Sequence, residues 1–157
     1  MKNIEREQIN KVIGDVFMQF PFMFAEPIER DEIEEVVGPI YRAIMVFHGD
    51  FSGKIEILLP KEVGVELTKN LLSDEFDEQV VPEREVVDSI KELANVICGH
   101  SLTTLFGEER IFNVDPPIVS NVTQKEWLDS LVSDDAFYFL VDDTPMFLEF
   151  KHCNEGV

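Results

Sequence analysis

The residues best suited to chemistry in this chain are Glu92 and Asn95, which stand three positions apart in a long segment of periodic apolar residues. Side chains at this spacing on an α-helix are neighbours, so the carboxylate and the amide could act on one target. Asparagine is a mediocre helix former that usually serves at caps, and a position in mid-helix therefore invites a functional explanation. The plain alternative is that every amphipathic helix has a polar face, on which Glu-x-x-Asn also occurs by chance.

The pair must be positioned by its helix, which the apolar periodicity predicts over 84–106 with Gly107 as the C-cap. With about 100° of rotation per residue, one side of this helix collects Val86, Ile90, Leu93, Ala94, Ile97 and Ser101. The opposite side is a narrow polar stripe made of Arg84, Asp88, Glu92, Asn95, Gly99 and Thr103. We expect the apolar side to pack against the core and the polar stripe to face outward.

The remaining elements predict an α+β fold with a mostly antiparallel sheet, and no linker is long enough to divide the chain. Apolar periodicity predicts helices over 4–20 and from Pro60 onward. Runs rich in β-branched and aromatic residues predict strands over 40–48, 51–59, 111–114, 118–122, 137–141 and 146–150. Gly49-Asp50 and Asp142-Asp143-Thr144-Pro145 are typical of hairpin turns.

Four segments are less clearly patterned. The run 22–25, Phe-Met-Phe-Ala, is expected to pack in the core, with a partner surface as the alternative. The acidic stretches 26–35 and 73–85 are expected to be a connection and a surface loop. The stretch 125–132 fits either a short helix or an irregular loop.

Composition limits the class of protein and its partners. The 157 residues hold 13 Lys+Arg against 32 Asp+Glu, a net charge of −19, together with 45% hydrophobic residues. This balance predicts one folded domain over 1–157, and the acidity argues against nucleic acid and anionic membrane surfaces. Two cysteines, Cys98 and Cys153, are too few for a disulfide framework, and no apolar leader follows Met1, so we expect a cytoplasmic protein. Three scattered histidines match no metal spacing, and no metal site is expected.

The segment 88–100, DSIKELANVICGH, resembles the signature helix of the CheC/CheX/FliY phosphatases of bacterial chemotaxis. That signature is Asp or Ser, three residues, Glu, two residues, Asn, and a proline further along, where this chain has Pro116-Pro117. The N-terminal helix, the hairpin with its Gly-Asp-x-x-Gly turn at 49–53 and the order of the later elements extend the resemblance over most of the chain. A chain of this length with one strong signature resembles the CheX branch of the family. This resemblance implies a CheC-like α/β sandwich with packed long helices.

The resemblance implies hydrolysis of the aspartyl phosphate on a CheY-type response regulator. Asn95 would hold the attacking water in line, and Glu92 would pair with a cation of the regulator, its active-site lysine. Asp88 would support the helix face or contact the regulator, and Gly99 would let the regulator approach closely unless it is a packing glycine. No cofactor of the chain's own is implied, because the regulator carries the Mg²⁺. A homodimer is also implied, and the hydrophobic strand 137–141 is expected to supply its edge.

A weak internal repeat aligns residues 7–14 with residues 92–99, so that Glu7, Asn10 and Gly14 match the glutamate, asparagine and glycine of the signature. CheC relatives carry two active helices, whereas CheX relatives keep one. The first copy resembles a vestigial second site, because Asn3 replaces the acidic or Ser position of the signature and Lys11 follows the asparagine.

An alternative of a different class stays open at this point. The fold family includes flagellar switch components, so the chain could be a non-catalytic CheC/FliN-like binding module for a receiver domain or for a chemotaxis or flagellar component. The intact pair Glu92 and Asn95 favours the enzyme.

Overall fold

The computed structural model describes residues 3–72 and 80–154. In this part of the chain the elements are α1 (Asn3–Gln19), β1 (Ala25–Ile28), the 3₁₀ helix η1 (Arg30–Glu32), β2 (Ile40–His48), β3 (Phe51–Pro60), α2 (Lys61–Leu71), α3 (Glu83–Phe106), β4 (Asn113–Val114), β5 (Ile118–Val122), α4 (Gln124–Leu131), β6 (Ala136–Val141) and β7 (Thr144–Asn154). Residues 73–79 of the expected loop 73–85 lie outside the described residues, and residues 83–85 begin α3.

The described strands form one sheet, in which every pairing is antiparallel. Its order is β1-β6-β7-β3-β2, and both β4 and β5 pair with the remaining side of β2. The β6–β7 hairpin turns on Asp142 and Asp143, whose φ angles of 44° and 70° fit the type I′ turn that matches strand twist. The predicted α+β class with an antiparallel sheet is confirmed.

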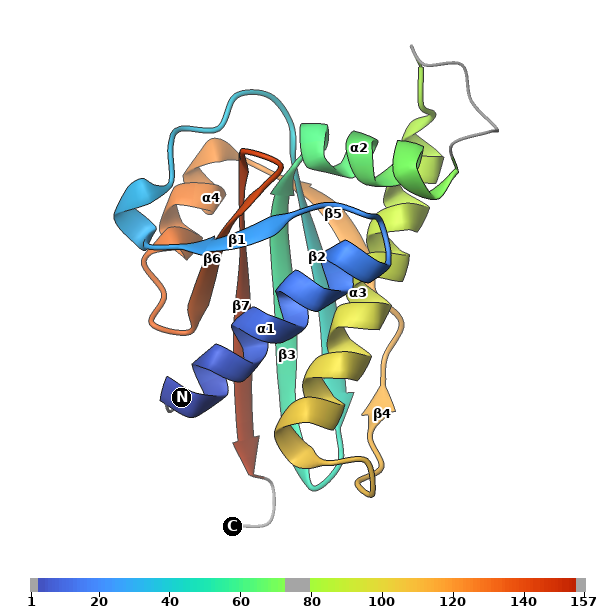
Figure 1. Cartoon of the computed structure of the whole chain (residues 1–157), viewed down its shortest axis with the longest axis vertical. Helices are drawn as coiled ribbons and strands as arrows, with labels where there is room; N and C mark the ends of the chain where they lie inside the picture. The colour runs from blue at the N-terminus through green and yellow to red at the C-terminus, as the bar shows by residue number, and fades with distance from the viewer. Residues whose placement is uncertain (1–2, 73–79, 155–157) are drawn as a thin grey trace.

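Helices α1, α2 and α3 cover one face of the sheet, and α4 covers part of the other (Figure 1). The two cores consist of alternating residues along the same strands, as the period of a β-strand requires. Tyr41 and Leu148 pack under α1 and α3, whereas their neighbours Ile40 and Phe147 pack with Trp127 of α4. The two faces of the sheet can therefore carry separate sites.

The structure resolves the ambiguity over 125–132 in favour of a helix. The hydroxyl of Thr123 accepts a hydrogen bond from the backbone N–H of Glu126, which caps α4. The acidic connection 26–35 was predicted incompletely, because it contains β1 and η1. The strand expected over 111–114 is shorter than predicted and comprises only β4.

The core prediction for 22–25 is half wrong. Met23 and Ala25 are buried, but Phe22 and Phe24 are 75% and 59% exposed. The chain leaves α1 through a bond from the Met23 N–H to the Phe17 carbonyl, with Phe22 in the left-handed region at φ 57°. That turn directs both phenylalanine rings outward, so the partner-surface alternative describes them better.

The edge expected at 137–141 is also wrong. Strand β6 pairs with β1 on one side and β7 on the other, so it lies inside the sheet. Its hydrophobic side chains Phe137, Phe139 and Val141 fill the main core. An argument for a dimer must start from another strand.

Candidate functional site

The polar stripe of α3 is exposed, as the periodicity predicted. Asp88, Glu92, Asn95 and Gly99 all face solvent. The buried residues between them are Ser89, Ile90, Leu93, Ala94, Ile97 and Cys98. Within residues 3–72 and 80–154, no hydrogen bond or ion pair engages the side chains of Asp88, Glu92 or Asn95. A partner could therefore take hold of these groups without breaking contacts inside the chain.

Helix α3 is held firmly at both ends. Near its start, the Tyr41 hydroxyl donates a 3.2 Å hydrogen bond to the Glu83 carboxylate, and burial together with this carboxylate raises the pKa of Tyr41. At its end, Phe106 stacks on Phe51 of β3 with ring centroids 4.3 Å apart. Gly107 then ends the helix with φ 91°. The exposed stripe thus lies on a rigid support, which favours precise positioning of a water or a partner.

Two glycines near α3 have different surroundings. A Cβ placed on Gly64 of α2 would lie 3.0 Å from Val86 and 3.2 Å from Ile90, so this glycine lets α2 pack closely on α3. A Cβ placed on Gly99 would meet nothing within 4 Å. Gly99 is therefore not a packing glycine of the described fold, and its cost to helix stability has no compensation within it.

Cys98 lies beside Gly99 in sequence but on the buried side of α3. Its side chain is 1% exposed, and burial raises the pKa of the thiol to about 11. The thiol therefore stays protonated at neutral pH and behaves as a small apolar group. It takes no part in the exposed site.

The second copy of the repeat lies on α1, which packs beside α3 on the same face of the sheet (Figure 1). Glu7 is exposed, but Asn10 is half-buried, and Lys11 pairs with Asp15 at 2.6 Å. The structure thus places both Glu/Asn pairs on adjacent helices, with a more exposed asparagine on α3.

The exposed groups offer a carboxylate and a neutral amide one turn apart, without a metal centre. The described residues contain no group of His, Cys, Asp and Glu that could hold a metal ion. None of the described helices is long and apolar enough to cross a membrane. The pair can orient a water molecule or hydrogen-bond a charged group.

Sequence reasoning missed a groove on the opposite face of the sheet. It lies between α4 and residues 33–36 and has Trp127 at its floor. The single tryptophan was a weak signal for a contact surface, but the acidic segment opposite was expected to be a plain connection. Nothing in the local pattern of either segment showed that the fold brings them together.

The chain has an α+β fold with an antiparallel sheet, and its candidate site is an exposed Glu-x-x-Asn pair on a helix. A family model described as chemotaxis phosphatase CheX matches residues 41–132, which is more than half of the chain and includes α3 but not α1. The chain belongs to the chemotaxis phosphatase CheX family.

Solved structures agree with this fold. A chemotaxis protein from Desulfovibrio vulgaris Hildenborough is 17% identical, with a TM-score of 0.69 and coverage of 96% of this chain and 97% of that chain. The chemotaxis protein CheX from Desulfovibrio desulfuricans is 15% identical, with a TM-score of 0.68 and coverage of 96% and 99%. The CheX-CheY-BeF3-Mg²⁺ complex from Borrelia burgdorferi gives 18% identity, a TM-score of 0.65 and coverage of 93% and 96%. No curated protein sequence matches.

Proposed function

We propose that this chain is a phosphatase that hydrolyses the aspartyl phosphate of a CheY-type response regulator. The observation that carries the proposal is the position of Asn95 in a chain of the CheX family. Its amide is exposed, unengaged and one helical turn from Glu92, on a helix that is fixed at both ends.

Hydrolysis of an acyl phosphate requires a water in line with the phosphorus–oxygen bond that breaks, between phosphorus and the aspartyl oxygen. The Asn95 amide can accept a hydrogen bond from this water and donate one, without adding negative charge beside the phosphoryl oxygens. The water oxygen bonds to phosphorus, the aspartyl oxygen leaves with the bonding electrons, and inorganic phosphate and free aspartate result. The Mg²⁺ that neutralises the transferring group belongs to the regulator, so the chain needs no cofactor of its own.

Glu92 has the role of fixing orientation. Its carboxylate, one turn from Asn95, would pair with the active-site lysine of the regulator, since a charge-assisted hydrogen bond is directional and strong. Asp88, one turn further toward the start of α3, would contact the regulator beside it. Gly99 would let the regulator's backbone approach the helix, in keeping with the open space above it.

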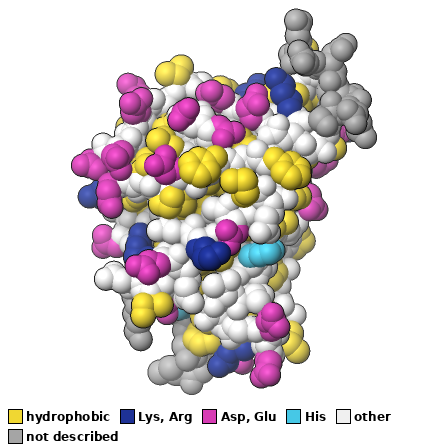
Figure 2. Space-filling model, viewed as in Figure 1, with side chains coloured by type: hydrophobic (Ala, Val, Ile, Leu, Met, Phe, Trp, Pro, Cys, Tyr) yellow, Lys and Arg dark blue, Asp and Glu magenta, His cyan; other side chains and the backbone are white. Residues whose placement is uncertain are grey.

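The face that carries α1 and α3 also has apolar side chains for docking. Figure 2 shows hydrophobic side chains over its upper half, with acidic side chains around them. Met18, Phe22 and Phe24 are all more than half exposed where α1 ends and β1 begins. Asn70 donates a 2.8 Å hydrogen bond to the Pro21 carbonyl, and Asp142 accepts one at 3.0 Å from the Phe24 N–H, so these rings are presented on a fixed turn.

We propose in addition that the chain forms a homodimer. The candidate edge is β5, which pairs with β2 on one side and has no second partner among the described strands. Ile118 of this strand is 67% exposed. An open strand with such a side chain invites pairing with another strand. A monomer in light scattering at micromolar concentration would reject the dimer.

The second candidate function is a binding module without turnover, as for flagellar relatives of the fold. The acidic surface and the docking side chains suit either function. The unengaged amide of Asn95 favours the enzyme, because a module that only binds has no need of an amide held free at this position.

Phosphate release from a phosphorylated receiver domain tests the proposal. We expect the chain to accelerate release over the receiver alone, and Asn95→Ala to abolish the acceleration while it still binds the receiver with its beryllofluoride analogue. Binding without acceleration, with several receivers, would replace the enzyme by the binding module. Equal acceleration by the wild type and by Asn95→Ala would remove Asn95 from the reaction.

A further inference from the structure

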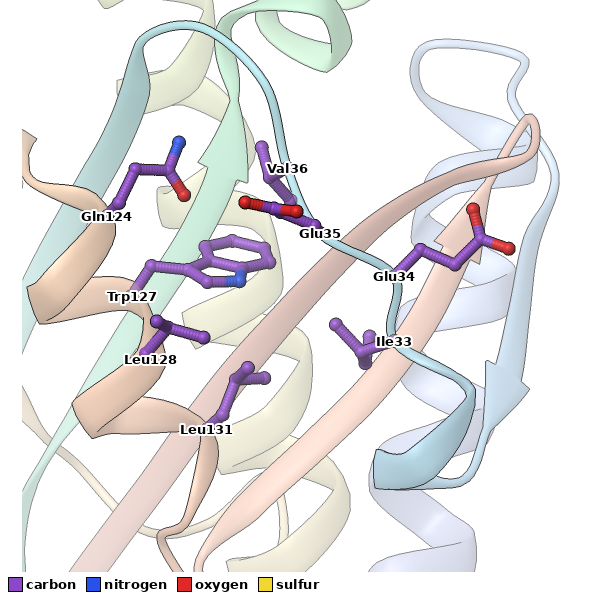
Figure 3. A pocket seen from close by; sticks show the side chains of 8 residues that line it. All are labelled: Ile33, Glu34, Glu35, Val36, Gln124, Trp127, Leu128 and Leu131. Carbon is purple, nitrogen blue, oxygen red and sulfur yellow. The ribbon is translucent and has the colours of Figure 1, made fainter.

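The groove on the far face of the sheet has two unlike walls. Helix α4 supplies Gln124, Trp127, Leu128 and Leu131, which share one face of the helix at the i, i+3, i+4, i+7 spacing. The extended segment opposite supplies Ile33, Glu34, Glu35 and Val36. Figure 3 shows the Trp127 ring between these walls, with Gln124 and Glu35 toward one end of the groove and Ile33 and Leu131 toward the other.

The floor of this groove is rigid and apolar. Trp127 is 1% exposed and packs edge-on against Phe147 of β7, with ring centroids 4.6 Å apart. Just beyond the opposite wall, the Gln124 amide of α4 donates a 3.5 Å hydrogen bond to the Gly38 carbonyl. Leu128, by contrast, is 59% exposed at the rim. The surface therefore combines a fixed floor with an apolar side chain that lacks cover.

The indole of Trp127 has an unused donor. No described residue accepts a hydrogen bond from its N–H. In Figure 3 the ring nitrogen lies on the edge of the indole on the side of Leu128 and Leu131, away from Glu35 and Val36. This N–H is not one of the buried polar atoms that lack a partner among the described residues, so solvent reaches it. A ligand that covers the groove would displace that solvent, and it would have to bring an acceptor such as a carbonyl oxygen.

The size of the groove suits the side chains of a peptide. Its volume is about 250 Å³. One or two large apolar side chains of a peptide would fill it. Because its carbonyl must be free of helical hydrogen bonds to reach the indole, the peptide should be extended.

The negative charge around the groove favours lysine or arginine on either side of the apolar side chains of that peptide. All seven charged residues between positions 26 and 35 are exposed, and Arg30 is the single cation among Glu26, Glu29, Asp31, Glu32, Glu34 and Glu35. A second hollow of about 290 Å³ adjoins the groove through Glu35 and Val36, and it is lined further by Glu62 and Asp143. Another acidic segment would be repelled here, whereas a basic one would be attracted.

We propose that this groove binds a short, extended segment of another protein, in which one or two large apolar side chains are flanked by lysine or arginine. The apolar side chains enter between Leu128 and Ile33, and a backbone carbonyl accepts the Trp127 N–H. The cations meet Glu34, Glu35 and the carboxylates of the adjoining hollow. Because α3 lies on the other face of the sheet, this segment and a response regulator can be bound together.

The probe for this proposal is a fluorescein-labelled peptide in which two leucines, separated by one serine, stand between pairs of lysines. Its binding is followed by anisotropy and by the emission of Trp127, the single tryptophan of the chain. Leu128→Ser should weaken binding about tenfold, because an exposed leucine that becomes covered contributes on this scale. Ile111→Ser removes an apolar side chain that is 86% exposed outside the groove, and it should leave binding within about twofold.

Matched charge variants separate the groove from general attraction to an acidic protein. Glu34→Gln/Glu35→Gln should weaken binding several-fold more than Glu108→Gln/Glu109→Gln, which removes the same charge from exposed positions after α3. Equal effects of the two pairs, or no effect of Leu128→Ser, would overturn the proposal. A dimer in light scattering that Leu128→Ser dissociates would assign the groove to a second copy and overturn it too.

Discussion

Helices α1 and α3 carry the same three residue types at the same spacing, yet the fold uses them differently. On α3, Asn95 is exposed and Gly99 has open space above it. On α1, Asn10 is half-buried, and a Cβ on Gly14 would lie 3.8 Å from the Ala25 carbonyl of β1. The difference shows that a repeated motif offers its side chains to a partner only where the packing leaves them free.

The rest of α1 explains why its copy is less available. The Arg6 guanidinium donates a 2.6 Å hydrogen bond to the Ala136 carbonyl and lies 4.2 Å from the centre of the Phe137 ring. These contacts attach α1 to β6, and Lys11 with its ion pair to Asp15 lies next to Asn10 in sequence. Polar residues of α1 thus make contacts within the chain. On α3 the hydrophobic residues pack into the core, and the Glu92 and Asn95 side chains make no hydrogen bond or ion pair with the described residues.

The largest expected effect is that of Asn95→Asp. The change keeps the size of the side chain but places a negative charge beside the phosphoryl oxygens and removes the amide donor. We expect the acceleration of phosphate release to fall on the order of 100-fold, as when a reacting group loses its position. Asn10→Asp on α1 is the matched control and should leave the acceleration unchanged. Equal losses in both variants would make the two helices equivalent.

A smaller loss is expected for Glu92→Gln. The glutamine keeps the length of the side chain but replaces a charge-assisted hydrogen bond by a neutral one, which should reduce kcat/KM about tenfold. Steady-state rates over a range of receiver concentrations measure this loss. Glu7→Gln, the same change at the corresponding exposed position of α1, is expected to have no effect, and a loss there would count against the asymmetry.

How far the sequence predicted these regions depended on how local the signal was. The 3.6-residue period of α3 is long and regular, so its bounds and its exposed stripe were predicted nearly to the residue. Strand β1 was missed because its four residues include Glu26 and Pro27, which are common in loops and are tolerated in an edge strand. The turn that exposes Phe22 depends on a bond back into α1 and has no local sequence signature.

The candidate site and the groove differ in the same way. Glu92 and Asn95 lie on one helix, so periodicity alone brought them together, although geometry alone did not assign them a reaction. The groove joins residues 33–36 to residues 124–131, which the sheet places side by side. A contact between segments so far apart depends on the register and order of the strands, which the local pattern does not encode.

The glycine pair sharpens the comparison by separating stability from docking. Gly99→Ala and Gly14→Ala should each raise the free energy of unfolding by about 0.5–1 kcal/mol, because neither new Cβ meets a clash and alanine favours the helix. Only Gly99→Ala should also weaken receiver binding, about threefold, because its methyl group keeps the partner's backbone from α3. Denaturant unfolding and a binding titration measure the two effects. Unchanged receiver binding by Gly99→Ala would place the contact elsewhere on the helix.

The smallest effect is expected when Glu7 and Asn10 of α1 are both replaced. Glu7→Gln combined with Asn10→Ala should keep phosphate release within about twofold of the wild type, since surface changes of this kind have small effects on folding and α3 retains its own pair. The informative measurement is the double variant in an Asn95→Ala background, where any residual acceleration must come from α1. If residual acceleration is present with Glu7 and Asn10 intact and vanishes when they are replaced, α1 is a second active helix. If Asn95→Ala gives no acceleration, whether Glu7 and Asn10 are intact or replaced, α1 takes no part in the reaction.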